Sequence, residues 1–122
     1  MSLGYFGYCK KILEDDIAVY YAYSGVNLND PDCDLSAKRA YDGAFAVDKS
    51  IMNWIPAKPN QTGPIYWAHA AIENGQAVVI TECKNAFKFS KDIDYIAEHL
   101  LFCIFEHLHE TGTLPESETF GK

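Results

Sequence analysis

The amino-acid sequence predicts an α+β fold, in which an antiparallel sheet of about four or five strands carries a long C-terminal helix packed on one face. Two observations predict it. Several short segments are rich in aromatic and β-branched side chains, as strands are, and residues 92–110 repeat apolar residues with the spacing of a helix. Because the chain has 122 residues, of which 48% are hydrophobic, residues 1–122 are predicted to form a single domain around one core.

The first two strands are predicted over residues 4–13 and 17–23. A short acidic segment, Glu14-Asp15-Asp16, separates them and suits the loop of an antiparallel hairpin. Gly4 and Gly7 weaken the interior of the first strand, so they favour a sheet edge or a bulge. Alternate residues of the second strand share one face, namely Ile17, Val19, Tyr21 and Tyr23.

The middle of the chain is predicted to contain two loops and one short strand. Residues 24–40 are rich in Gly, Pro, Asn, Asp and Ser, which is typical of a long loop. A strand follows over residues 44–48, with Phe45 and Val47 on the same side. Three prolines and a glycine within residues 56–64 then predict a second loop inside the same domain.

Residues 65–83 fit two different structures. Asn74-Gly75 between two apolar runs is a strong signal for a β-hairpin, and the hairpin is the favoured interpretation. In the alternative, the first half of this segment is a second helix, because Pro64 suits a first helical position and Gly75 suits the residue after a helix end. A strand over residues 78–80 is predicted in both cases.

The C-terminal helix is predicted over residues 92–110. Ser90 or Asp92 is expected to cap its start, while Gly112 and Pro115 end it. The polar tail over residues 116–122 is expected to be loose. One broad apolar face of the helix is expected to lie on the sheet, formed by Ile93, Ile96, Ala97, Leu100, Leu101, Ile104 and Leu108.

The opposite side of this helix carries a candidate interaction patch. Tyr95 and Phe102 project from it seven residues apart, with Phe105 to one flank and Glu98 and Glu106 on either side. Aromatic rings beside carboxylates suit a contact with a partner protein or with a second copy of the chain, which would make a homodimer. The alternative is that another segment of the same chain covers the rings.

The same helix carries residue types that bind metal ions. His99, Cys103 and His107 lie at positions i, i+4 and i+8, and imidazole and thiolate are good zinc ligands. The outer two are roughly 12 Å apart along the helix axis, so at most two serve one ion and further ligands, with His69 as a candidate, come from elsewhere. The alternative is that Cys103 is a small buried apolar residue and the histidines border the core. The sequence specifies no cofactor.

An acidic run in the long loop resembles the beginning of an EF-hand calcium loop. Asp30, Asp32 and Asp34 alternate there and offer hard oxygen ligands. Leu35 stands where that family needs glycine and Tyr41 where it needs glutamate, so an EF-hand is rejected. A calcium site of another type and a turn-rich loop whose aspartates bind their own backbone remain as alternatives.

Charge and composition narrow the classes of partner. With 17 acidic and 10 basic residues, the formal net charge is −7, which argues against nucleic acid and anionic membrane surfaces and suits a basic partner. The sequence shows neither a signal peptide nor an apolar run of transmembrane length, so a cytoplasmic location is expected. The four cysteines lack C-x-x-C spacing and are therefore interpreted as reduced thiols.

The leading functional hypothesis is a non-enzymatic protein-interaction module that binds a basic partner, such as a small bacterial inhibitor or toxin-neutralising protein. It depends on the acidic surface, on Tyr95 and Phe102, and on the lack of nucleophile, phosphate-binding or paired-carboxylate motifs. The alternative is a metal-binding or small-ligand-binding domain, which includes an enzyme, that uses the histidines and Cys103.

Overall fold

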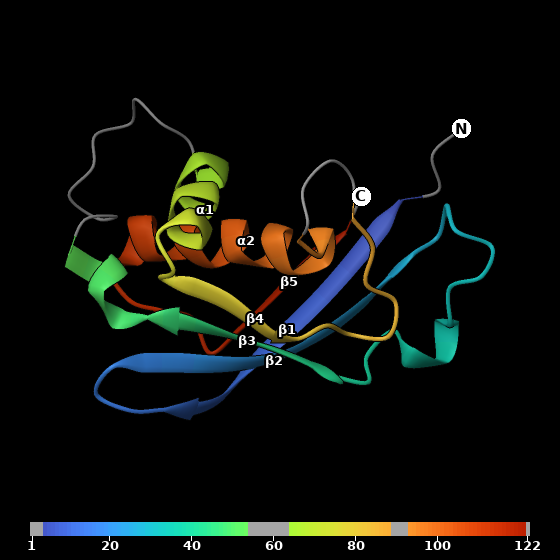
Figure 1. Cartoon of the computed structure of the whole chain (residues 1–122), viewed down its shortest axis with the longest axis horizontal. Coiled ribbons are helices and arrows are strands. Elements are labelled where there is room, and N and C mark those ends of the chain that lie inside the picture. The colour runs from blue at the N-terminus through green and yellow to red at the C-terminus, as the bar shows by residue number, and fades with distance from the viewer. Residues whose placement is uncertain (1–3, 54–63, 89–92, 122) are drawn as a thin grey trace.

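The computed structural model describes residues 4–53, 64–88 and 93–121. Five of its elements are strands that form one antiparallel sheet in the order β4-β3-β2-β1-β5, and two are α-helices that lie on the same side of that sheet (Figure 1). This arrangement confirms the predicted α+β fold. The elements are β1 (Tyr5–Glu14), β2 (Ala18–Asn27), η1 (Leu35–Ala37), β3 (Gly43–Asp48), η2 (Lys49–Asn53), α1 (Pro64–Glu73), β4 (Ala77–Thr81), α2 (Tyr95–Thr111) and β5 (Ser117–Gly121).

The predicted hairpin at the N-terminus is confirmed, and it forms the centre of the sheet. β1 and β2 pair antiparallel from Tyr5 opposite Asn27 to Glu14 opposite Val19, with a bulge between Lys11 and Leu13. The acidic loop is held by Asp15, whose carboxylate accepts hydrogen bonds of 2.8 Å from two backbone N–H groups, those of Ile17 and of Ala18, the first residue of β2. The short polar loop therefore fixes the register of both strands.

One face of β2 supplies the middle of the core. Val19, Tyr21 and Tyr23 are essentially inaccessible there, while Ile17 lies outside the strand and is 69% exposed. The buried Tyr21 hydroxyl donates a 2.7 Å hydrogen bond to the carbonyl of Pro115, in the segment that follows α2. The shared face predicted for residues 17–23 is confirmed at Val19, Tyr21 and Tyr23 but is wrong at Ile17, and the Tyr21 bond brings the end of the C-terminal helix onto the sheet.

The C-terminal tail is a strand, so the prediction of a loose tail is wrong. β5 pairs antiparallel with β1, and β1 therefore lies inside the sheet and not at the edge that its glycines favoured. Gly7 lies opposite Phe120, and a Cβ atom at Gly7 would stand 2.2 Å from the Phe120 ring. The glycine thus makes room for the aromatic ring that anchors the last strand, and the ring stacks on His99 at 4.2 Å.

The favoured hairpin over residues 65–83 is wrong, and the alternative helix is correct. α1 ends in a Schellman motif, in which Gly75 takes a φ of 76° and donates to the Ile72 carbonyl, while Gln76 donates to the Ala71 carbonyl. The Asn-Gly pair therefore ends a helix here instead of forming a hairpin turn. The predicted strand after it is confirmed as β4.

The C-terminal helix is confirmed as α2, with a different N-cap. Asp94 caps it through a side-chain hydrogen bond from the Ile96 N–H, whereas Ser90 and Asp92 lie outside the described residues. Gly112 closes the other end at a φ of 79° and donates to the Leu108 carbonyl, as predicted. α2 packs on β1, β2 and β5, and α1 packs on both α2 and β4. The predicted core face is buried at Ile96, Ala97, Leu100, Leu101, Ile104 and Leu108, and only Ile93, which precedes the helix, is partly exposed.

Candidate interaction site

The face of the sheet opposite the helices carries an apolar row that crosses four strands. Its members are defined by the strand register: Val78 pairs with Ala46, Ala46 with Tyr20, and Tyr20 with Leu13. Val78 is 50% and Leu13 60% exposed, and no α-helix of the described residues covers this side. We call these four residues the open-face row. Contiguous exposed apolar surface of this kind marks a contact site more often than isolated side chains do.

The far part of the same face is covered by the chain itself. The loop between β2 and β3 lies over it, since the Ser24 hydroxyl donates 2.9 Å to the Lys38 carbonyl. The Lys38 ammonium sits 4.8 Å from the centre of the Phe6 ring, and the Arg39 guanidinium 4.6 Å from that of Tyr8. The loop thus closes one half of the open face and leaves the half that carries the open-face row accessible.

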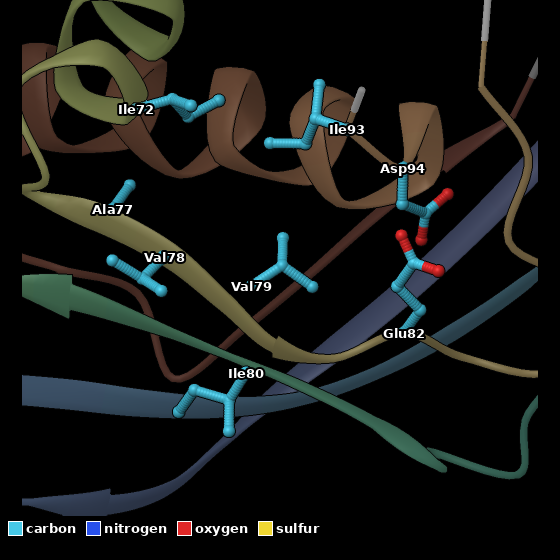
Figure 2. Close-up of a pocket in the computed structure, with 8 residues that line it drawn as sticks. All are labelled: Ile72, Ala77, Val78, Val79, Ile80, Glu82, Ile93 and Asp94. Atoms are coloured by element: carbon cyan, nitrogen blue, oxygen red, sulfur yellow. The ribbon is translucent and has the colours of Figure 1, made fainter. Parts of the chain in front are cut away.

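A groove of about 420 Å³ runs along the outer side of β4, beside the end of this row. Its walls come from α1, from β4 and from the segment that enters α2, as Figure 2 shows. Val79 points up toward the helices, whereas Val78 and Ile80 point to the open face, where Ile80 is 56% exposed. The lining residues are Ile72, Ala77, Val78, Val79, Ile80, Glu82, Ile93 and Asp94.

The backbone of β4 faces this groove at alternate residues. The carbonyl of Gln76 accepts from the Asp48 N–H at 2.7 Å, so Gln76 directs its backbone groups toward β3. Because successive residues of a strand direct these groups to opposite sides, Ala77 and Val79 direct theirs away from β3. No described strand pairs with that side of β4. An edge of this kind is a template for an added strand.

One end of the groove is acidic. Glu82 and Asp94 direct their carboxylates toward each other there (Figure 2). Asp94 is inaccessible and accepts a 2.5 Å hydrogen bond from the Tyr23 hydroxyl, with further ones from the backbone N–H groups of Ile96 and Phe87. Glu82 is more exposed and lies 3.0 Å from the Lys88 ammonium. Two carboxylates therefore face one ammonium at this end, which leaves it negative overall.

The groups around Asp94 form a buried, hydrogen-bonded cluster. Burial, and to a smaller extent the charge of Glu82, raises the pKa of Asp94, while its three hydrogen bonds lower it. Burial also raises the pKa of the adjacent Cys83 thiol to about 12, so this thiol is protonated at neutral pH and is a poor nucleophile. The buried cluster therefore serves to fix the start of α2 against β2 and the groove.

The structure places the predicted interaction patch differently from the sequence prediction. Phe105 is fully buried and Glu98 is 8% exposed, so neither lies on the surface as predicted. The reason is α1: its His69 imidazole lies 3.6 Å from the Glu98 carboxylate, and Phe105 is two turns further along the same side of α2. A helix of the same chain, α1, therefore covers the side of α2 that carries Glu98 and Phe105.

The remaining members of the patch are partly or fully accessible. Glu106 is exposed, and Tyr95 and Phe102 are each partly buried. Tyr95 packs against Tyr5 and Phe87 with ring centres 5.5 Å away, and Phe102 lies 5.3 Å from His99. The two rings are thus held by their own chain along one side, and their role in contacting a partner stays a prediction.

The residues predicted to bind metal lie along α2 at different depths. His99 is buried beneath Phe120, whereas Cys103 and His107 are partly exposed. His69 is on α1 and faces Glu98. Across the parts of the chain that the structure describes, no three His, Cys, Asp or Glu side chains are grouped so that they could hold a metal ion.

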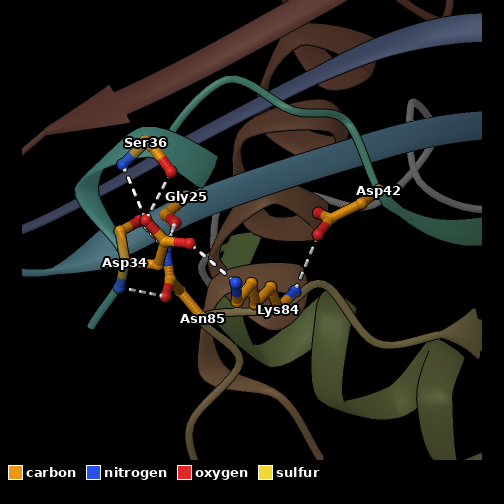
Figure 3. Close-up of polar contacts among 6 residues, drawn as sticks. All are labelled: Gly25, Asp34, Ser36, Asp42, Lys84 and Asn85. Carbon is orange, nitrogen blue, oxygen red and sulfur yellow. Dashed lines mark hydrogen bonds and ion pairs between the residues drawn. The ribbon is translucent and has the colours of Figure 1, made fainter. Parts of the chain in front are cut away.

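The aspartates of the long loop bind the protein itself. Asp30 accepts from the Asp32 N–H at 2.9 Å, and Asp34 accepts from the Ser36 N–H and lies 2.7 Å from the Lys84 ammonium. Figure 3 shows how Asn85 joins this loop to the sheet, since its amide donates to the carbonyls of Gly25 and Asp34. These contacts match the turn-rich alternative. The Asp34 carboxylate, which a calcium ion would need as a ligand, is already paired with the Lys84 ammonium.

Two further results concern the class of protein. None of the helices in the described ranges is both long and apolar enough to cross a membrane. Comparisons with protein-family models, curated proteins and solved structures find no match to this chain.

The sequence contains one feature of the β4 site that the predicted interaction patch does not include. Val78, Val79 and Ile80 form a continuous apolar run, which is typical of a strand covered on both faces. Among the described residues this strand is at the edge of the sheet and both α-helices lie on one face, so Val78 and Ile80 remain exposed. The contrast between an apolar run and an edge position becomes visible only when the strand order is known.

Proposed function

We propose that this protein is a small acidic interaction module that binds a basic partner protein, and that it acts without chemistry of its own. The observation that carries the proposal is the open-face row, an exposed apolar surface on a molecule whose net charge is −7. Apolar contacts supply affinity at such a surface, while the net negative charge of the molecule favours partners of opposite charge and speeds their encounter.

The surroundings of the row support a basic partner. Asp16 and Glu82 are exposed acidic residues in the segments next to its two ends, and Asp48 ends the strand that crosses its middle. An inhibitor or toxin-neutralising protein acts in this way, by covering the working surface of a basic protein. All four cysteines are free thiols, which is consistent with a reducing compartment such as the cytoplasm.

The proposal is tested by identifying a partner and then measuring its binding with purified components. The tagged protein is used to capture partners from the cells that produce it, and each candidate is titrated by calorimetry at about 50 and 300 mM salt. We expect a saturable complex with a protein of basic isoelectric point, weakened several-fold at the higher salt because screening reduces the charge attraction. An acidic partner, a salt-independent affinity or no saturable partner would refute the proposal.

A further inference from the structure

We infer that the partner binds by adding an extended segment to the free edge of β4, antiparallel or parallel, as a sixth strand of the sheet. This inference rests on the proposed function and specifies the site and the chemistry of its ligand. The ligand is a strand-forming segment with apolar side chains in its centre and Lys or Arg at one or both ends.

The backbone of β4 supplies the first part of the recognition. Ala77 and Val79 direct N–H and C=O groups away from β3, along the groove. A peptide in extended conformation satisfies these groups by the same ladder that joins the other strands. Main-chain hydrogen bonds of this type give affinity without specifying a sequence, so the side chains must provide the selectivity.

The two sides of an added strand meet different apolar surfaces. Side chains that point toward the helices enter the groove beside Ile72, Val79 and Ile93. Side chains that point the other way lie next to Val78 and Ile80, and they extend the open-face row by one more strand. Because both sides are apolar, the central residues of the ligand must be apolar in both orientations, as in Val- and Ile-rich segments.

The charges at the ends of β4 select a basic ligand over a second copy of this chain. Glu73 precedes the strand and Glu82 follows it, and Glu82 shares its end of the groove with Asp94. Lys88 already lies beside Glu82, but one ammonium leaves a carboxylate in excess there. A second copy would bring the same acidic flanks to this edge together with its own charge of −7, which opposes self-pairing.

The test uses a synthetic probe and a matched pair of variants of the full chain. The probe is a fluorescent peptide of about ten residues with alternating Val and Ile in the centre and Lys at both ends, whose pattern suits an added strand with two apolar sides. Two control peptides carry Glu in place of Lys, or backbone N-methyl groups at alternate residues that remove the N–H donors. Ile80→Lys places a charge beside the edge, and Ile12→Lys makes the same change at a residue with the same 56% exposure on β1.

We expect the Lys-flanked peptide to bind with a Kd below about 1 mM and each control peptide to bind at least about tenfold more weakly. Ile80→Lys should reduce binding of the probe and of the natural partner by at least about tenfold, because an inserted lysine blocks strand addition, while Ile12→Lys stays within about twofold of the parent protein. Hydrogen exchange should slow at the Ala77 and Val79 amides when the probe is bound. Glu82→Lys should reverse the preference between the Lys and Glu peptides.

The outcomes separate this inference from the proposed function. If a basic partner binds equally to the parent and to Ile80→Lys, the function stands and strand addition at β4 is refuted. The same holds if the N-methylated peptide binds as well as the probe, or if the probe does not bind at about 1 mM. A dimer that Ile80→Lys dissociates would show that a second copy occupies the edge, and this would also refute the inference. If the probe binds as expected but no basic partner exists, the proposed function alone fails.

Discussion

Asp94 links several parts of the molecule that are far apart in the sequence. It caps α2, accepts from the backbone of the preceding segment and accepts the buried hydroxyl of Tyr23 on β2. The Cys83 thiol lies 3.8 Å from the same carboxylate. A buried charge is stable only when its hydrogen bonds are satisfied, and here each of its two oxygens has a partner. One residue therefore fixes the helix, the sheet and the acidic end of the groove relative to one another.

We expect Asp94→Ala to lower the free energy of unfolding by about 3 kcal/mol. Loss of an N-cap costs about 1 kcal/mol, and the buried Tyr23 hydroxyl left without an acceptor adds about 2 kcal/mol. Asp94→Asn keeps an oxygen for the cap and should cost only about half as much, since it removes the charge and leaves the shape. Urea denaturation measures both values.

The control for this pair is Asp16→Ala, which removes the same charge from an exposed position between β1 and β2. Its effect should stay within about 0.5 kcal/mol. Equal destabilisation by Asp94→Ala and Asp16→Ala would show that the Asp94 contacts contribute nothing specific to stability.

At the scale of elements, the last strand depends on one aromatic residue. β5 has five residues, three of which are exposed, and its single large apolar side chain is Phe120. This ring fills the space above Gly7 and stacks on His99. Strand pairing alone is weak for so short a segment at a sheet edge, so we attribute its position to the ring.

We therefore expect Phe120→Ala to release β5 from the sheet and to cost about 2 kcal/mol of stability, less than for a fully buried ring because Phe120 is partly exposed. Hydrogen exchange at residues 117–121 should accelerate while exchange in β2 and β3 changes little. Thr119→Ala, on the neighbouring exposed position of the same strand, is the control and should leave both quantities unchanged. Equal exchange in the two variants would show that the backbone ladder alone holds β5.

The elements that the sequence predicted well are those with long or strongly alternating patterns. The apolar spacing over residues 92–110 predicted α2, and the alternation through Val19, Tyr21 and Tyr23 predicted the central strand. The Asn74-Gly75 pair misled because a hairpin turn and a Schellman motif both need a residue with positive φ, so the pair indicates a reversal without specifying what precedes it. β5 was missed because a polar strand with one apolar ring has no pattern of its own.

The candidate site depended on information that no local pattern contains. Burial of Phe105 and Glu98 follows from the crossing of α1 over α2, and a hairpin over residues 65–83 would not provide that crossing. The open-face row likewise follows from strand order and register, which join residues 78, 46, 20 and 13 across four strands. The net charge follows directly from the composition, whereas tertiary packing determines where apolar side chains stay exposed.

At the scale of the whole molecule, the cover of the sheet is asymmetric. Both helices protect one face, the β2–β3 loop protects half of the other, and the open-face row occupies the rest. The two sheet edges also differ, because β5 has Phe120 as its one large apolar residue, whereas β4 is an apolar run that ends at Thr81. Exposed apolar side chains lie both around the β1–β2 turn and along β4, and a net charge of −7 opposes the association of copies.

The labelling rates of the four cysteines measure whether the protein unfolds in one cooperative step. Cys9 and Cys83 are buried, and burial raises the pKa of each thiol to about 12, whereas Cys33 and Cys103 are partly exposed. At pH 8 a thiol reagent should therefore modify Cys33 and Cys103 within minutes, while the two buried thiols react at the rate of global unfolding. Reaction of all four within minutes is expected only in denaturant.

The measurement uses Cys33→Ser/Cys103→Ser, which removes the fast phase and leaves Cys9 in the core and Cys83 beside the groove. Equal labelling rates at these two sites, matching the unfolding rate from urea kinetics, would show one cooperative unit, because neither site then opens on its own. Faster labelling of Cys83 would show that the segment between β4 and α2 opens locally, and would contradict cooperative opening. Since Asp94 binds this segment to Tyr23, adding Asp94→Ala should accelerate labelling at Cys83 more than at Cys9.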